Sequence, residues 1–97
     1  MLKNKNSKAM LHIGYSNYVV TEKITGIFTN DTSPVKKLVS RAKANEAVVD
    51  LTKDKATRSV ILMDDGVIIL SAINPATLVQ RVQEGNNEEN MLDEEVN

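Results

Sequence analysis

Apolar positions recur along the chain with two different periods. Near the amino end, Leu11 and Ile13 alternate with polar neighbours, and turn-forming residues separate them from the strand-forming run 18–20. This alternation is typical of short strands joined by a turn. Residues 24–29 predict a further strand, in which Gly26 indicates a bulge or a point where another group approaches closely.

A helical period appears twice. The clearest helix starts at Ser33, a good N-cap, followed by Pro34 at the first helical position, where its missing N–H costs nothing. The apolar residues of this segment fall at the i, i+3, i+4 and i+7 positions of one helix face: Val35, Leu38, Val39 and Ala42. Asn74-Pro75 repeats this start, and Gly85 ends a second helix with four residues predicted to face inward: Ala76, Leu78, Val79 and Val82.

Three short strands are predicted between the helices. Residues 48–51 form the first, and residues 59–63 and 67–70 form a pair joined around Asp65-Gly66, a strong hairpin signal. The pair is almost continuously apolar, which indicates that both of its faces are covered. The order of strands and helices predicts an α+β domain with a small, mostly antiparallel sheet and two helices.

Composition limits the class of protein. A chain of 97 residues forms one domain, expected over residues 11–84, between a polar extension (1–10) and an acidic tail (85–97), both predicted to be disordered. The absence of cysteine excludes disulfides and thiolate chemistry. No apolar run is long enough to span a membrane, and no signal peptide is recognisable. We therefore expect a cytoplasmic protein with no membrane partner.

The net charge of −1 conceals an uneven distribution. Residues 1–83 hold all 12 Lys and Arg residues against 7 acidic residues, whereas residues 84–97 hold 6 acidic residues and no base. The chain is thus a basic body with an acidic tail. Such a tail can be merely solvated, or it can compete with a polyanion for the basic surface.

Signals for catalysis are weak. His12 is the single histidine and has no evident partner to orient it as a general base, so a structural histidine is the simpler interpretation. Asp64 and Asp65 are explained by the predicted hairpin turn. We find no phosphate-binding glycine loop and no metal-ligand spacing. We therefore expect no enzyme activity, no cofactor and no small-molecule substrate.

The cations form three groups. Lys23 lies between two predicted strands, the first helix presents Lys36, Lys37, Arg41 and Lys43, and the loop before residue 59 contains Lys53, Lys55 and Arg58. A solvated surface explains the helix, where Arg41 and Lys43 also complement the helix dipole. The loop can be an ordinary polar turn or an anion-binding site, because Asp54 partly offsets the charge of Lys53 and Lys55. The residues alone leave both interpretations open.

Three segments resemble a known family. The runs "HIGYSNYV", "TSPVKKLVSRAKA" and "VVDLTKDKATRSVILMDDGVIILSAINPATLVQRV" are similar, in order and spacing, to the RemA family of bacterial extracellular matrix regulatory proteins. The resemblance covers roughly residues 11–82. It implies a regulator of matrix, biofilm and osmotic-response genes that binds double-stranded DNA. It also implies a fold related to the LytTR DNA-binding domain and a closed homo-oligomeric ring.

The resemblance also implies which positions face DNA. They are Lys23, Lys55, Ala56 and, flanking them, Arg58; family members commonly have arginine at the first three positions. Lysine keeps the charge but loses the bidentate geometry of arginine, and Ala56 has no charge. As DNA-binding residues we therefore predict the loop and Lys23, with the basic helix as a further backbone contact: Lys23, Lys53, Lys55, Arg58, Lys36 and Lys37. The alternative is an oligomeric scaffold that has lost DNA binding.

Overall fold

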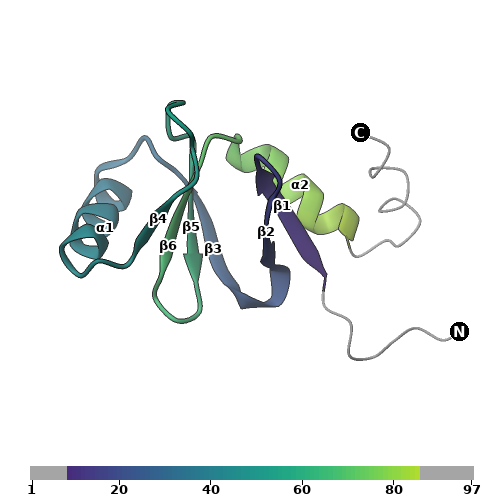
Figure 1. Cartoon of the computed structure of the whole chain (residues 1–97), viewed down its shortest axis with the longest axis horizontal. Coiled ribbons are helices and arrows are strands. Elements are labelled where there is room, and N and C mark those ends of the chain that lie inside the picture. Colours follow the sequence, from purple (N-terminus) through teal and green to yellow (C-terminus); the bar gives the residue numbers. More distant parts are fainter. Residues whose placement is uncertain (1–8, 86–97) are drawn as a thin grey trace, which may run out of the picture.

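The computed structural model describes residues 9–85 and has the predicted α+β composition (Figure 1). Its elements, in chain order, are β1 (Met10–Gly14), β2 (Asn17–Val20), the 3₁₀ turn η1 (Thr21–Lys23), β3 (Ile24–Thr29), α1 (Ser33–Ala44), β4 (Val48–Asp50), β5 (Ser59–Met63), β6 (Ile68–Ser71) and α2 (Pro75–Gly85). Most of the predicted extension and tail, residues 1–8 and 86–97, lies outside the described residues. Met10 belongs to β1, where it pairs with Val20.

The strands form two sheets rather than one. β1 and β2 make an antiparallel hairpin, and a four-stranded sheet has the order β3-β5-β6-β4. The β3–β5 and β5–β6 pairs are antiparallel, as predicted, but β4 runs parallel to β6. Since β6 lies between β4 and β5, the connection from β4 to β5 must cross the carboxyl end of β6. This connection is the cationic loop.

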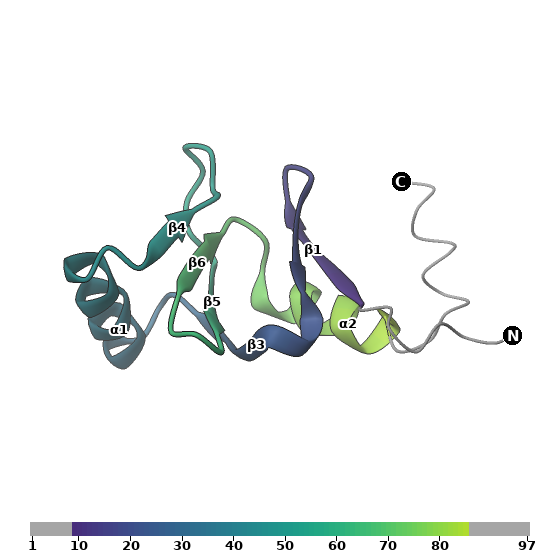
Figure 2. The same cartoon turned by 60° about the horizontal axis from the view of Figure 1, so that its bottom comes forward.

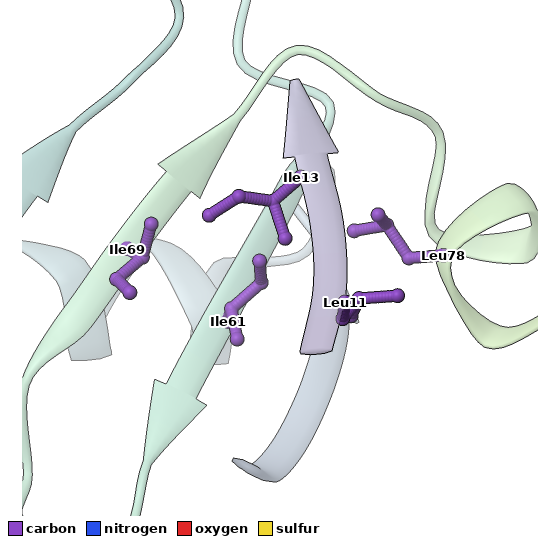
Figure 3. Close-up of a cluster of buried hydrophobic side chains, with 5 residues drawn as sticks. All are labelled: Leu11, Ile13, Ile61, Ile69 and Leu78. Atoms are coloured by element: carbon purple, nitrogen blue, oxygen red, sulfur yellow. The ribbon is translucent and has the colours of Figure 1, made fainter. Parts of the chain in front are cut away.

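Alternate residues of β5 and β6 contribute to two separate cores. Val60, Ile68 and Leu70 pack with α1, whereas Ile61 and Ile69 pack with β1 and α2. The second core is centred on five buried side chains, shown in Figure 3: Leu11, Ile13, Ile61, Ile69 and Leu78. The prediction that both faces of this strand pair are covered is therefore confirmed.

Gly26 has the predicted role of a close-approach point. The register between β3 and β5 shifts between Ile24 and Gly26. A Cβ atom at position 26 would lie 2.7 Å from Cζ of Phe28, closer than side-chain atoms pack. Any larger residue at position 26 would therefore force the Phe28 ring to shift.

Helix α1 starts one residue earlier than predicted. Thr32, not Ser33, is the N-cap: its backbone is extended, and its carbonyl accepts the first helical hydrogen bond, from Lys36 N at 3.0 Å. No side-chain oxygen caps the helix. Val39 and Ala42 are buried against the sheet as the spacing predicted.

Helix α2 buries a narrower face than predicted. Asn74 acts as the N-cap, since its Oδ1 accepts a hydrogen bond from Ala76 N at 2.9 Å. Leu78 is fully buried and Val82 packs against the same core. Ala76 and Val79, however, are exposed, Val79 to 41%. The prediction for these two residues was wrong because only one side of the helix contacts β1 and β3 in a single chain.

Candidate nucleic-acid interface

The cationic loop, residues 51–58, is attached to the sheet at both ends. Leu51 N donates to Leu70 O at 3.0 Å, and Arg58 N donates to Ser71 O at 2.9 Å. Both acceptors belong to the last residues of β6. The loop therefore starts and ends on the same buried strand, and its base is fixed.

A turn built on Asp50 shapes the start of the loop. Asp50 Oδ1 accepts hydrogen bonds from Thr52 N at 3.0 Å and from Thr52 Oγ1 at 2.7 Å. These bonds from Thr52, together with the charge of Lys43, hold the pKa of the Asp50 carboxyl below its ordinary value. Lys53 and Asp54 then adopt the left-handed backbone region, with φ of 51° and 73°. Non-glycine residues rarely adopt this region, and when they do it is often at functional sites.

The loop presents its cations to solvent. Lys53, Lys55 and Arg58 are all exposed. Within residues 9–85, no ion pair or side-chain hydrogen bond engages Lys55 or Arg58. Two cationic side chains are thus available for an anion from outside the chain.

The tip of the β1–β2 hairpin lies next to this loop. Figure 2 shows the two segments projecting from the same side of the molecule. Lys53 Nζ is 5.0 Å from the ring centre of Tyr15, a cation–π contact that connects them. Tyr15 and Ser16 are also left-handed, with φ of 52° and 64°. Sequence reasoning had treated residues 14–17 only as a turn; an aromatic residue inside a tight turn was the signal that it missed.

An open pocket of about 450 Å³ separates the two segments. Its walls come from the hairpin, the cationic loop and the chain after β6: His12, Gly14, Tyr15, Lys55, Ala56, Arg58, Ala72 and Ile73. No acidic residue lines it. The arrangement suits an anionic ligand with an apolar part.

Lys23 lies at the opposite end of β5. Its carbonyl accepts a hydrogen bond from Asp64 N at 2.7 Å, and its ammonium lies 3.9 Å from the Asp64 carboxylate. Arg58 precedes β5 and Asp64 follows it. Because a strand rises about 3.3 Å per residue, the two ends of β5 lie roughly 20 Å apart. A single chain therefore does not bring Lys23 together with Lys53, Lys55 and Arg58.

The basic face of α1 is a third, separate set of cations. Lys36, Lys37, Arg41 and Lys43 are exposed, and the helix lies beyond β4, away from the β1–β2 hairpin (Figure 1). Of these, Lys43 acts electrostatically on Asp50 at the start of the cationic loop. The structure thus brings the loop together with Tyr15, and leaves Lys23, Lys36 and Lys37 apart from it.

Comparison with known proteins identifies the family. The family model described as "RemA-like: Extracellular matrix regulatory protein A-like" matches residues 10–82. The chain belongs to the RemA-like family. A relative from Dictyoglomus turgidum is 38% identical over 80 residues, covering 82% of this chain and 94% of the relative. One from Bacillus cytotoxicus is 39% identical over 84 residues, covering 87% and 93%. Both carry the name "putative regulatory protein".

The remaining candidates for chemistry in this RemA-like chain have structural partners. Asp65 Oδ1 accepts a hydrogen bond from Val67 N at 3.1 Å within the β5–β6 turn, and Asp64 pairs with Lys23. Among the described residues, no three His, Asp or Glu side chains converge on a possible metal site. No helix of that region is both long enough and apolar enough to cross a membrane.

His12 is held against α2. Arg81 Nη1 lies 3.1 Å from His12 Nδ1 and donates to His12 O at 3.0 Å, while Ser16 N approaches His12 Nε2 at 3.3 Å. A neutral imidazole carries one ring proton, so only one of its two nitrogens can accept a hydrogen bond from these donors. Burial, assisted by the charge of Arg81, lowers the pKa of His12 below its ordinary value. The imidazole is thus a neutral structural group on the pocket wall.

Proposed function

We propose that this protein is a DNA-binding transcriptional regulator of extracellular matrix and biofilm genes that acts as a homo-oligomeric ring. In this proposal, Lys53, Lys55 and Arg58 contact the phosphate backbone of double-stranded DNA. Lys23, Lys36 and Lys37 are weaker, peripheral contacts. The family supports the regulatory role, and the proposal includes the kinship to LytTR DNA-binding domains that the sequence resemblance implied.

One observation carries the DNA-binding part: the cationic loop is fixed at its base, yet two of its three cations have no partner among the described residues. Both ends of the loop are hydrogen-bonded to β6, while Lys55 and Arg58 make no ion pair within residues 9–85. A phosphate-binding loop benefits from such anchoring, because fixing the donors in advance lowers the entropy lost on binding.

Exposed apolar surface supports assembly. Val79 and Val82 of α2 line a second hollow of about 260 Å³ with Ile24 and Ile27 of β3. β3 is also an edge strand, with no strand paired to its outer side among the described residues. A second copy of this protein would cover both features.

Assembly and DNA binding reinforce each other. Two or three phosphate contacts per chain give weak binding at cellular salt, since each adds only about −0.9 to the slope of log affinity against log salt. A ring repeats the loop, so that binding by each further loop becomes intramolecular. Sequence-independent lysines then suffice for affinity, and specificity comes from DNA shape and bending.

The test is fluorescence anisotropy of duplex DNA over a salt series, with light scattering on the same samples. A Lys55→Gln/Arg58→Gln variant should assemble normally and lose about a hundredfold in affinity at low salt. The matched control, Arg41→Gln/Lys43→Gln, removes the same two charges from α1 and should stay within about threefold of the native protein.

Ala56 motivates a test of the alternative, an oligomeric scaffold that has lost DNA binding. It is exposed in the middle of the cationic loop and contributes no charge. If the native assembly ignores duplex DNA even at low salt, or if the loop variant and the α1 control lose affinity equally, the loop is not a DNA-binding surface. The protein would then be an oligomeric interaction module.

A further inference from the structure

The pocket between the hairpin tip and the cationic loop combines two kinds of surface. On one side, Lys55 and Arg58 supply positive charge that no described acidic side chain neutralises. On the other, Tyr15, Ala72 and Ile73 supply apolar and aromatic surface. The phosphate backbone of duplex DNA would use only the positively charged surface. The second kind needs a ligand that carries a ring or sugar next to its phosphate.

Tyr15 places an aromatic ring at the surface of the protein. The chain has one Phe, two Tyr and no Trp. Tyr15 and Tyr18 both lie on the β1–β2 hairpin and are 43% and 57% exposed. Placing scarce aromatic rings at the surface forgoes their large contribution to a core. The Lys53 ammonium, 5.0 Å from the Tyr15 ring centre, favours this position of the ring at the edge of the pocket.

The floor of the pocket is pre-formed. Ser71 Oγ donates to Ile13 O at 2.9 Å and accepts from Ile73 N at 3.0 Å. Ser59 Oγ, fully buried, donates to Ile73 O. These bonds hold the segment after β6 against β1 and β5, so the floor does not have to be ordered when a ligand enters.

Ala56 leaves the pocket open. It lines the wall between Lys55 and Arg58, and its side chain is a single methyl group. A longer side chain at this exposed position would occupy the space without disturbing either core. The volume of about 450 Å³ lies within the range of small-ligand sites, roughly 300–1,000 Å³.

We propose that this pocket binds a free nucleoside monophosphate. Arg58 and Lys55 bind its phosphate, as a guanidinium and an ammonium do, and Tyr15 contacts its base or sugar. The regulatory consequence rests on the proposed function: because the nucleotide and the DNA backbone use the same two cations, the nucleotide competes with DNA.

The test starts without DNA. Adenosine 5′-monophosphate, adenosine and inorganic phosphate are titrated into the native assembly and followed by NMR chemical shifts or calorimetry. The nucleotide should saturate the protein and bind about tenfold more tightly than either fragment, because only the nucleotide uses both surfaces. Tyr15→Ser, Arg58→Gln and Ala56→Leu should each weaken the nucleotide about tenfold or more, and Arg41→Gln should leave it within about twofold.

Several outcomes would overturn the proposal. Equal affinity for phosphate and for the nucleotide would show that the pocket binds only the phosphate group. Unchanged nucleotide binding in Tyr15→Ser or Ala56→Leu would place the ligand elsewhere. Saturation by a six-nucleotide single strand but not by the free nucleotide would assign the pocket to a nucleic-acid strand instead.

A competition experiment separates this proposal from the proposed function. Adenosine 5′-monophosphate should displace duplex DNA from the native protein at a concentration about tenfold lower than from Tyr15→Ser, which keeps Lys55 and Arg58 and should bind duplex within about threefold of native. Displacement equal in both proteins would show that the nucleotide acts only through ionic strength. If the native protein binds the nucleotide but no DNA, the pocket stands and the proposed function fails.

Discussion

The two ends of strand β5 carry the same kind of side chain in opposite electrostatic situations. At the amino end, Lys55 and Arg58 project without an acidic partner among the described residues. At the carboxyl end, Lys23 lies 3.9 Å from the Asp64 carboxylate, and both side chains are more than half exposed. Charge alone therefore does not define a binding surface. The free end differs from the paired end in what surrounds the cation.

The backbone around the two ends differs as well. The amino end receives a loop that crosses β6 and contains two left-handed residues, Lys53 and Asp54. The carboxyl end is the compact β5–β6 turn, in which Gly66, at φ 90°, supplies the left-handed residue. The longer loop exposes unpaired cationic side chains, whereas the cation beside the short turn is already paired with an acidic side chain. Under the proposed function, the amino end of β5 therefore contacts DNA, and the carboxyl end mainly closes the β5–β6 hairpin.

Preventing the proposed assembly should reduce DNA affinity more than any other change. Val79→Glu places a charge on the apolar hollow between α2 and β3. In the proposed ring, assembly supplies an effective-concentration gain of about 10²–10⁴, so we expect at least a hundredfold loss of DNA affinity together with a smaller particle in light scattering. Gln83→Glu adds the same charge to an exposed position of α2 and should change neither. An intact assembly in Val79→Glu would exclude this interface.

Removing one cation from each end tests the comparison directly. Arg58→Gln should lower DNA affinity about tenfold and reduce the salt slope by about 0.9 for each phosphate that the variant no longer neutralises. Lys23→Gln should lower the affinity by no more than about twofold, because Asp64 already offsets its charge. Anisotropy over a salt series compares the affinity and the salt slope of the two variants. Equal losses of affinity would mean that both ends bind DNA.

The shape of the loop should matter apart from its charge. Asp50→Ala removes the acceptor of both Thr52 hydrogen bonds, and the disordered loop should bind DNA about fivefold more weakly despite the lost negative charge. Asp50→Asn loses the same charge but keeps a side-chain oxygen for the turn. It should bind at least as well as the native protein. Weakening by both variants alike would show that the turn is not needed.

Freeing Lys23 should make the carboxyl end more like the amino end. Asp64→Asn removes the paired carboxylate and should raise DNA affinity about twofold at low salt. Asp65→Asn removes an adjacent charge while keeping the oxygen that accepts from Val67 N. Its effect should be smaller. If both variants gain equally, the change reflects net charge and not the ion pair.

The smallest effect is expected from pH. Folding lowers the pKa of His12 below 6.5, so the unfolded chain binds the proton more readily. The resulting stability is present above pH 6.5 and is lost as pH falls toward the folded value. The melting temperature should therefore decline between about pH 7 and about pH 5.5, and less so in His12→Gln. An identical decline in both proteins would assign the effect to other groups.

Sequence alone determined the elements and the family. The strand and helix periods, the Asp65-Gly66 hairpin and the close approach at Gly26 are local properties, and each is present in the structure. The family resemblance is likewise confirmed by the match over residues 10–82. The errors at Thr32, Ala76 and Val79 are small shifts of a cap or a face, because a residue can satisfy its local preference in more than one register.

Only the tertiary structure decided which cations lie close together. In the sequence, Lys23 belongs to the same predicted set as Lys55 and Arg58, and Tyr15 is one residue of a turn. Strand order separates Lys23 from that set by the length of β5, and it brings Tyr15 within cation–π distance of Lys53. The pairing of β4 with β6 was the unpredicted step that placed the loop there. Such pairing depends on interactions between residues far apart in the chain, and no local period records them.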